Sequence, residues 1–346
     1  MAHHSEVRRR ERSSAAETNR HGFWAALRAH AATFLRWVRR HFGRTESASN
    51  RFGDYTLVRK LGEGGMGVVY EAIHSLLGRP AAIKVLAPER SRDLDLKRFE
   101  REVRITSQLT HPNTIAVYDF GSTDEGSLYY AMEYVDGLDL QTLVERDGPQ
   151  DPARVALLLA QLAGALAEAH GAGIVHRDVK PANVMVCERG GVPDVVKVLD
   201  FGLAESIVHD ETDASEARSV VGTPLYLSPE AITTPEGVDA RSDLYALGAV
   251  GYFLLTGVPP FSGANVIEVC ARHLSETPRP PSELRAGIGP ELDALLLRCL
   301  EKSPSDRPVS ATALRHELLD LASQWTEARA ASWWAGQSSD RAAIAA

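Results

Sequence analysis

The chain has 346 residues, of which 44% are hydrophobic and 24% are charged, and its formal net charge at pH 7 is −8. This composition is ordinary for a soluble globular protein, and the length accommodates one large domain or two. The three cysteines, Cys187, Cys270 and Cys299, lie far apart without a C-x-x-C pair, which argues against a disulfide framework or a zinc site and favours a cytoplasmic location. No apolar run is long enough to cross a bilayer, so we expect no transmembrane anchor.

The charge is unevenly distributed along the chain. Residues 1–53 hold eleven Arg and no Lys against four Glu, a net charge of +7, which leaves −15 for the remainder. We therefore expect a basic N-terminal extension whose partners differ from those of the acidic body. No motif that reads nucleic acid accompanies the arginines, so we expect no nucleic-acid partner.

Large apolar residues from Phe23 to Phe42 recur at helical spacing, with arginines between them. This pattern predicts a basic amphipathic helix over residues 22–42. Its apolar stripe could dock on the rest of the chain or on a partner protein. Alternatively, the helix could lie peripherally on an anionic membrane surface, an attraction that the acidic body would oppose.

A glycine-rich stretch follows a strand predicted over residues 55–58. It reads Leu61-Gly62-Glu63-Gly64-Gly65-Met66-Gly67-Val68-Val69-Tyr70. In dinucleotide-binding folds the third glycine of G-x-G-x-x-G opens a helix, but Gly67 runs into residues that favour a strand. A Walker loop is excluded because Val68, not Lys, follows Gly67. The stretch therefore predicts a hairpin whose backbone N–H groups can approach phosphate oxygens.

Further along lie a strand over residues 81–85 that carries Lys84, a helix from residue 91 or 93 to residue 109, and an apolar strand over residues 128–135. The next helix is predicted over residues 152–172 from the period of its leucines. Other helical stretches are predicted around residues 264–273, 290–300 and 310–322. Residues 188–194 are predicted to form a hairpin turn without chemistry.

The run His176-Arg177-Asp178-Val179-Lys180-Pro181-Ala182-Asn183 carries the densest set of reactive groups. Pro181 prevents a regular helix, so these side chains belong to a loop. A short apolar strand then delivers Asp200 into a Gly turn. One carboxylate can orient a hydroxyl nucleophile, and the second, with the Asn183 carboxamide, can hold Mg²⁺ on a triphosphate, which is the equipment of phosphoryl transfer.

These motifs, taken in order, resemble the catalytic core of the bacterial eukaryotic-like serine/threonine protein kinases over residues 54 to 322. The resemblance implies an α+β, two-lobed protein kinase fold. A small β-rich N-lobe would cover residues 54–135, a larger helical C-lobe residues 136–322, and a C-terminal tail residues 323–346. It also implies a Ser/Thr protein kinase that uses ATP and Mg²⁺, acts on protein substrates and phosphorylates itself.

The resemblance assigns roles to individual residues. The implied catalytic residues are Asp178, which orients the substrate hydroxyl, Lys180, which neutralises the transferred phosphoryl group, Lys84, which contacts the phosphates, Glu102, which pairs with Lys84, and Thr223, which bridges Asp178 and Lys180. Glu100 is a rival to Glu102. The implied metal ligands are Asn183 and Asp200. The implied nucleotide-binding residues are Leu61, Gly62, Gly64, Gly67, Val69, Ala82, Lys84, Met132, Glu133, Val135 and Met185, with Glu133 and Val135 acting through their backbone.

The remaining expectations concern support and regulation. Glu230 is expected to pair with Arg307, and Asp243 either braces the catalytic loop or caps a helix. Trp325, Trp333 and Trp334 either pack on the large lobe or mark a partner site. In the acidic segment before Glu230, Ser215 is the first candidate for activating phosphorylation and Thr212 and Ser219 are alternatives, although the acidic neighbours leave order without phosphate open. A pseudokinase usually lacks the base, the metal carboxylate or the strand Lys, and all three are present here.

Overall fold

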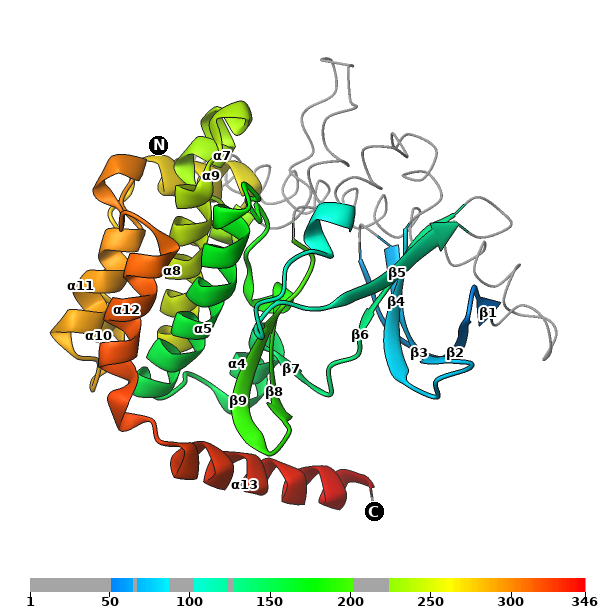
Figure 1. The fold of residues 1–346 in the computed structure, drawn as a ribbon. Coiled ribbons are helices and arrows are strands. Elements are labelled where there is room, and N and C mark those ends of the chain that lie inside the picture. The colour runs from blue at the N-terminus through cyan, green and yellow to red at the C-terminus, as the bar shows by residue number, and fades with distance from the viewer. Residues whose placement is uncertain (1–50, 65–66, 87–102, 123–126, 202–223, 346) are drawn as a thin grey trace, which may run out of the picture. The chain divides into compact units, whose positions relative to one another are not determined.

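The structure is a computed structural model that describes residues 51–64, 67–86, 103–122, 127–201 and 224–345 (Figure 1). The strands are β1 (Arg51–Phe52), β2 (Tyr55–Gly64), β3 (Gly67–His74), β4 (Pro80–Leu86), β5 (Val117–Ser122), β6 (Leu128–Glu133), β7 (Gly137–Asp139), β8 (Val184–Arg189) and β9 (Val192–Val198). The helices are α4 (Leu140–Asp147), α5 (Pro152–Gly171), α7 (Pro229–Thr233), α8 (Ala240–Thr256), α9 (Val266–Ser275), α10 (Pro281–Leu284), α11 (Pro290–Cys299), α12 (Ala311–Leu321) and α13 (Glu327–Ala345). Short 3-10 turns include η1 (Pro181–Asn183) and η2 (Pro224–Tyr226).

Several predictions fall outside these ranges. They are the amphipathic helix over residues 22–42, Glu100 and Glu102, Thr223, and the candidate phosphorylation sites Thr212, Ser215 and Ser219. Of the helix predicted to end at residue 109, the structure describes residues 103–109 and is helical over 103–106.

The described residues divide into two units. The first comprises residues 51–59 and 72–79, and the second contains the rest. In the first unit, β1 pairs with the start of β2, so that Phe52 lies opposite Tyr55. The Tyr55 ring packs edge-on against His74 with ring centroids 5.0 Å apart.

In the second unit, one sheet has the order β2, β3, β4, β6, β5, with residues 60–64 of β2 and 67–71 of β3, and β7, β8 and β9 form another. In β6 every residue is buried, and in β4 every residue after Pro80 is buried. This burial on both faces explains why these strands read as continuous apolar runs rather than as alternating patterns. The antiparallel β4–β6 register sets Lys84 directly opposite Tyr130.

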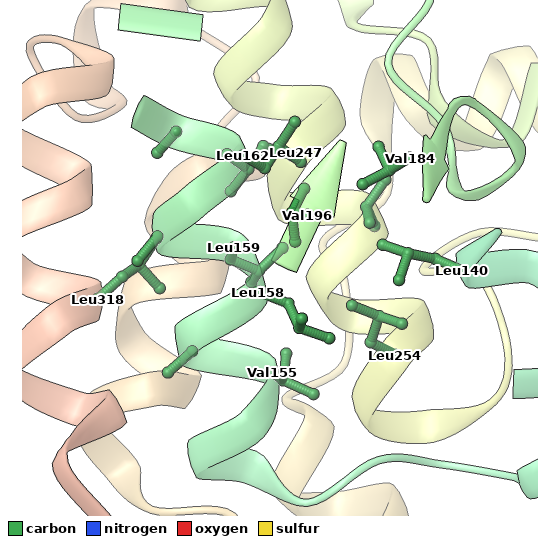
Figure 2. Close-up of a cluster of buried hydrophobic side chains, with 14 of the residues drawn as sticks. Leu140, Val155, Leu158, Leu159, Leu162, Val184, Val196, Leu247, Leu254 and Leu318 are labelled. Carbon is green, nitrogen blue, oxygen red and sulfur yellow. The ribbon is translucent and has the colours of Figure 1, made fainter. Parts of the chain in front are cut away.

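Helix α5 lies at the centre of the helical part. It begins at Pro152, whose fixed φ suits the first helical position, and the Asp151 side chain accepts hydrogen bonds from two N–H groups of the first turn. Figure 2 shows the leucines of α5 packed among side chains from α8, α12, β8 and β9. Of the described helices, α5 alone is long and apolar enough to cross a membrane, and its apolar side chains are buried in this core.

The predicted α+β architecture, with a strand-rich part followed by a helical part, is confirmed. The helices predicted over residues 152–172, 264–273, 290–300 and 310–322 correspond to α5, α9, α11 and α12, with ends that differ by at most two residues. Helix α5 stops at Gly171, and Ala172 closes its last turn with backbone hydrogen bonds.

The hairpin turn predicted within residues 188–194 is confirmed, but it is shorter than predicted. The turn is confined to Gly190 and Gly191, both with positive φ, and β9 begins at Val192. Asp194 is buried inside this strand and forms a bidentate ion pair with Arg154 of α5, with N–O distances of 3.0 and 2.6 Å. A buried carboxylate needs such a partner, because an unpaired charge in an apolar interior is strongly disfavoured.

The C-terminal tail covers this ion pair. Helix α13 runs beside β9 (Figure 1), and the indole N–H groups of Trp325 and Trp334 each donate a 2.8 Å hydrogen bond to Asp194. The Trp333 ring lies 3.7 Å from the Arg154 guanidinium carbon, a cation–π contact. Packing of the three tryptophans on the helical part is therefore confirmed.

Candidate active site

The loop between α5 and β8 gathers its reactive groups around Asp178. Lys180 Nζ lies 3.0 and 2.7 Å from the two carboxylate oxygens of Asp178. The Asn183 carboxamide N–H group donates to both the backbone carbonyl and the carboxylate of Asp178, at 2.8 Å each. Pro181 opens the single turn η1 that returns Asn183 to this position. The three side chains named by the sequence motif therefore form one hydrogen-bonded group.

A side chain of helix α8 holds this loop in place. The Asp243 carboxylate accepts hydrogen bonds from the backbone N–H groups of His176 and Arg177 at 2.8 and 2.9 Å, and it contacts His170 Nε2 at 2.8 Å. Arg177 adopts a left-handed φ of 65°. Such a conformation is uncommon for a residue with a side chain and persists where neighbouring bonds fix it.

His176 connects the loop to the segment that carries Asp200. It is fully buried, its Nε2 lies 2.9 Å from the Leu199 carbonyl oxygen, and its ring packs on Phe201 at 4.7 Å. In addition, the Leu199 N–H group donates to the Asn183 carbonyl at 2.9 Å. The two expected metal ligands, Asn183 and Asp200, therefore lie on two segments that are hydrogen-bonded to each other.

Asp200 receives two donors, one on each carboxylate oxygen. Lys84 Nζ lies 2.6 Å from Oδ2, and the Tyr130 hydroxyl donates to Oδ1 at 2.5 Å. Burial raises the pKa of the Asp200 carboxyl, but the charge of Lys84 and the hydrogen bonds from Lys84 and Tyr130 outweigh it, so the pKa lies below its ordinary value. Burial, then the Asp200 charge, raises the pKa of Tyr130 well above 10. The arrangement therefore favours an ionised carboxylate facing a neutral phenol.

The expected partner of Lys84 was Glu102, which lies outside the described residues. The partner that the structure does show is Asp200, in an ion pair whose two side chains are largely buried. Sequence analysis placed Lys84 and Asp200 at the same nucleotide but did not predict their direct contact.

The glycine-rich stretch forms the end of β2 and the start of β3. Leu61, Gly62 and Gly64 close β2, and Gly67 opens β3. Gly67 has a φ of 141°, and a Cβ atom there would lie 2.0 Å from the Val85 carbonyl oxygen. A side chain is therefore sterically excluded at Gly67, whereas a Cβ at Gly62 would meet nothing within 4 Å.

The residues expected to surround the adenine ring fall in one apolar cluster. Its buried members include Ala82, Met132 and Val135, and the partly buried Val69 and Met185 pack against them. These five side chains come from β3, β4, β6, β8 and the segment after β6. An apolar surface assembled from several strands can cover the faces of a flat heterocycle, which is how small-molecule sites are commonly lined.

Glu133 was expected to bind nucleotide through its backbone, but its side chain also makes contacts. Its N–H group donates to the Ala116 carbonyl at 2.8 Å, which leaves the carbonyl as the atom able to meet the adenine edge. Its buried carboxylate pairs with Lys197 at 3.0 Å and with Arg189. These ion pairs join the end of β6 to β8 and β9, and the sequence did not predict them.

The predicted Glu230–Arg307 pair is confirmed. Arg307 donates to both oxygens of Glu230 at 2.6 and 2.8 Å, and Ser242 donates to the same carboxylate at 2.5 Å. Burial raises the pKa of Glu230, but the Arg307 and Ser242 hydrogen bonds outweigh it and leave the pKa below its ordinary value. The pair ties α7 to α8 and to the segment after α11. Thr223, the residue expected to bridge Asp178 and Lys180, lies outside the described residues.

The donor set at Asp200 and Asn183 fits Mg²⁺. Magnesium prefers oxygen ligands and is commonly held by one or two carboxylates together with substrate phosphates. Each Asp200 oxygen accepts one hydrogen bond and retains a further lone pair. The Asn183 N–H group is directed at Asp178, so its carboxamide oxygen is available to a cation. Within the described ranges no cluster of three or more His, Cys, Asp or Glu side chains could hold a metal by itself, so phosphates would have to complete the shell.

The sequence matches the protein kinase domain family over residues 55–319. The chain belongs to the protein kinase family, and the two-lobed kinase fold expected for it is confirmed.

Relatives in this family are bacterial serine/threonine-protein kinases. The chain is 44% identical to pkn3 of Myxococcus xanthus over 271 residues, which are 76% of this chain and 49% of that protein. It is 42% identical to PknB of Mycobacterium tuberculosis over 269 residues, 77% of this chain and 42% of PknB. The chain thus spans about half the length of these relatives.

Two solved structures give the same fold. The Mycobacterium tuberculosis PknI kinase domain matches with a TM-score of 0.61 and 32% identity, over 80% of this chain and 100% of that one. A structure of Rad53 in complex with AMP-PNP matches with a TM-score of 0.64 and 26% identity, over 77% of this chain and 65% of that one.

Proposed function

We propose that this chain is an active Ser/Thr protein kinase that transfers the γ-phosphoryl group of ATP to hydroxyl groups of protein substrates and of itself. The observation that supports this most directly is the group formed by Asp178, Lys180 and Asn183, connected through one backbone hydrogen bond to the segment of Asp200. Lys180 two residues after Asp178 is typical of Ser/Thr kinases.

In this function Asp178 orients the substrate hydroxyl and accepts its proton. Its carboxylate is held by Lys180 and Asn183, so its direction is fixed before the substrate arrives and little reorganisation is needed. Lys180, which lies beside the Asp178 carboxylate, would neutralise charge on the transferred phosphoryl group. Asn183 and Asp200 would hold Mg²⁺, which neutralises charge on the ATP phosphates.

Transfer of label from ATP to a generic basic protein tests this proposal. The purified full chain, supplied with Mg²⁺, is expected to label the protein and itself, with label on Ser and Thr and none on Tyr. Chelation of the metal and Asp200→Asn should both abolish labelling. A chain that binds ATP but labels neither itself nor any protein would be a nucleotide-binding scaffold, and one that labels only small molecules would be a different kind of kinase. Either result would contradict the proposal.

We further propose a cytoplasmic protein whose basic segment, residues 22–42, docks on the kinase body or on a partner protein. The charges of +7 and −15 on the two parts of the chain support docking on its own body. Peripheral binding to an anionic membrane is the alternative. A synthetic peptide of residues 22–42 that sediments with anionic vesicles at low salt, and does not bind the chain that lacks it, would favour the membrane instead.

A further inference from the structure

Tyr130 and Lys84 reach Asp200 from neighbouring strands. They are direct partners in the antiparallel β4–β6 register, so their side chains project from the same face of the sheet. Lys84 Nζ donates to Oδ2 of Asp200 at 2.6 Å, and the Tyr130 hydroxyl donates to Oδ1 at 2.5 Å. The strand pairing thus supplies two donors that hold one carboxylate at two points.

Packing alone does not explain why residue 130 carries a hydroxyl group. The Tyr130 ring is buried, 1% exposed, in the apolar cluster that includes Leu86, Val103 and Met132. A Phe would fill this space without a polar atom that must find a partner. The oxygen is instead directed at the carboxylate expected to bind the metal, in a short charge-assisted hydrogen bond.

The two donors differ in what else they do. Under the proposed function Lys84 also contacts the nucleotide phosphates, so its bond to Asp200 is shared with the substrate. Within the described ranges, the Tyr130 hydroxyl donates to Asp200 and the ring is buried in the apolar cluster. When Lys84 turns to the phosphates, Tyr130 remains as the donor that keeps Asp200 in place.

We propose that Tyr130 is a positioning residue that pre-orients the Asp200 carboxylate for the divalent cation of the bound nucleotide; this inference rests on the proposed function. Asp200 lies in a left-handed conformation, φ 56°, which a residue with a side chain keeps where neighbouring contacts fix it. A hydrogen bond on Oδ1 fixes the plane of the carboxylate and still leaves a lone pair on each oxygen for the cation. Groups that orient metal ligands in this way raise metal affinity without touching the metal.

The test is a binding measurement rather than an activity assay. Affinity for the non-hydrolysable analogue AMP-PNP is measured on the full chain by calorimetry, once with Mg²⁺ and once with EDTA. The ratio of the two affinities is the gain contributed by the metal. Tyr130→Phe is expected to lower this gain on the order of 10-fold, while the affinity in EDTA stays unchanged because the apolar nucleotide surface is intact.

Tyr129→Phe is the matched control. Tyr129 is the next residue of β6 and is also buried, but strand alternation directs it to the opposite face, where it packs on Gly121. This variant should keep the wild-type metal gain. Asp200→Asn gives the reference for a damaged metal site. Thermal unfolding without nucleotide establishes that each variant is folded, and should Tyr130→Phe be unfolded, Tyr130→Met, which adapts to the same space, takes its place with the same expected loss.

The outcomes separate this inference from the proposed function. A metal gain in Tyr130→Phe equal to that of wild type, or larger than it, would overturn the inference alone, since a larger gain would mean that the hydroxyl competes with the cation. If wild type itself gains nothing from Mg²⁺, the inference and the proposed metal-dependent function both fail.

Discussion

Asp243 shows how a single buried carboxylate can hold the loop of Asp178. The sequence left open whether it braces the loop or caps its own helix. The cap of α8 is Asp239, whose side chain accepts from the Arg241 N–H group at 2.8 Å, whereas Asp243 accepts from the backbone of His176 and Arg177. Asp243 therefore braces the loop, and it also contacts His170 of α5.

Replacing Asp243 by Ala should be costly. Two buried backbone N–H groups lose their acceptor, and each unsatisfied group costs about 1–3 kcal/mol, so we expect the free energy of unfolding in urea to fall by about 3 kcal/mol. Asp239→Ala removes the cap of the same helix and an exposed ion pair with Arg241, and should cost about 1 kcal/mol. Equal losses in the two variants would mean that Asp243 does not hold the loop.

The glycines of the glycine-rich stretch between β2 and β3 are not equivalent. Gly67→Ala places a methyl group against the Val85 carbonyl at a φ of 141°, so we expect a loss of about 1–3 kcal/mol in the free energy of unfolding and weaker ATP binding. Gly62→Ala, where a Cβ meets nothing within 4 Å, should change stability by no more than about 0.5 kcal/mol. Denaturant titration and nucleotide binding on both variants check this contrast, and a Gly67→Ala variant as stable as Gly62→Ala would contradict it.

At the scale of helices, His273 of α9 packs against Tyr245 of α8, and folding lowers the pKa of this histidine. His273 is fully buried, the Tyr245 hydroxyl lies 2.8 Å from its Nδ1, and the Phe261 ring is 4.9 Å away. Burial, and then the nearby charge of Lys302, lower the pKa of His273 to about 4 from 6.5.

This shift predicts a pH dependence. Between pH 6.5 and 4 the unfolded chain binds a proton at His273 and the folded chain does not, so the stability present above pH 6.5 is lost as the pH falls towards 4. At about 1.4 kcal/mol per pKa unit, the full contribution is about 3 kcal/mol. His273→Asn, which keeps an acceptor for Tyr245, should therefore lose less stability than wild type between pH 7 and 4.5. His316→Asn, at an exposed position of α12, should follow wild type. A His273→Asn variant with the wild-type pH dependence would disprove the assignment.

The C-terminal helix α13 is predicted to be an integral part of the fold. Trp334 is 5% exposed and hydrogen-bonds to Asp194, so Trp334→Ala should lower the free energy of unfolding by about 3–5 kcal/mol. Ser332→Ala on the exposed side of the same helix should change it by about 0.5 kcal/mol or less. Urea unfolding of both variants measures this difference, and a loss below about 1 kcal/mol for Trp334→Ala would show that the tail only rests on the surface.

Elements with strong local signals were predicted correctly from the sequence. Helix α5 follows from the period of its leucines and from Pro152, and the geometry around Asp178 follows because Lys180 and Asn183 lie within five residues of it. Tyr130 and Asp200 are 70 residues apart, and their contact depends on a strand register that no local pattern specifies.

The Arg154–Asp194 pair was missed for a related reason, although signals existed. Arg154 lies four residues before Leu158, on the apolar side of α5, and Asp194 interrupts a strand otherwise rich in valine. A cation and a carboxylate in two such positions can be expected to be buried together. Tertiary packing alone determines which cation pairs with which carboxylate. It also determines that tryptophans cover the pair.

Over the whole molecule, charge separates the basic extension, +7 over residues 1–53, from the remainder of the chain, −15. The described residues place the loop of Asp178, the strands of Lys84 and Tyr130, and the helix of Asp243 in contact with one another or with Asp200. The proposed function depends on this core, whose contacts hold the carboxylates of Asp178 and Asp200.

The most direct test of that function is the rate of phosphoryl transfer in a single turnover at saturating ATP and Mg²⁺, for wild type and for Asp178→Asn. Because a positioned base contributes on the order of 10²–10⁴-fold, the variant should be slower by a factor in that range while its ATP affinity is unchanged. Transfer by Asp178→Asn at the wild-type rate would contradict the account.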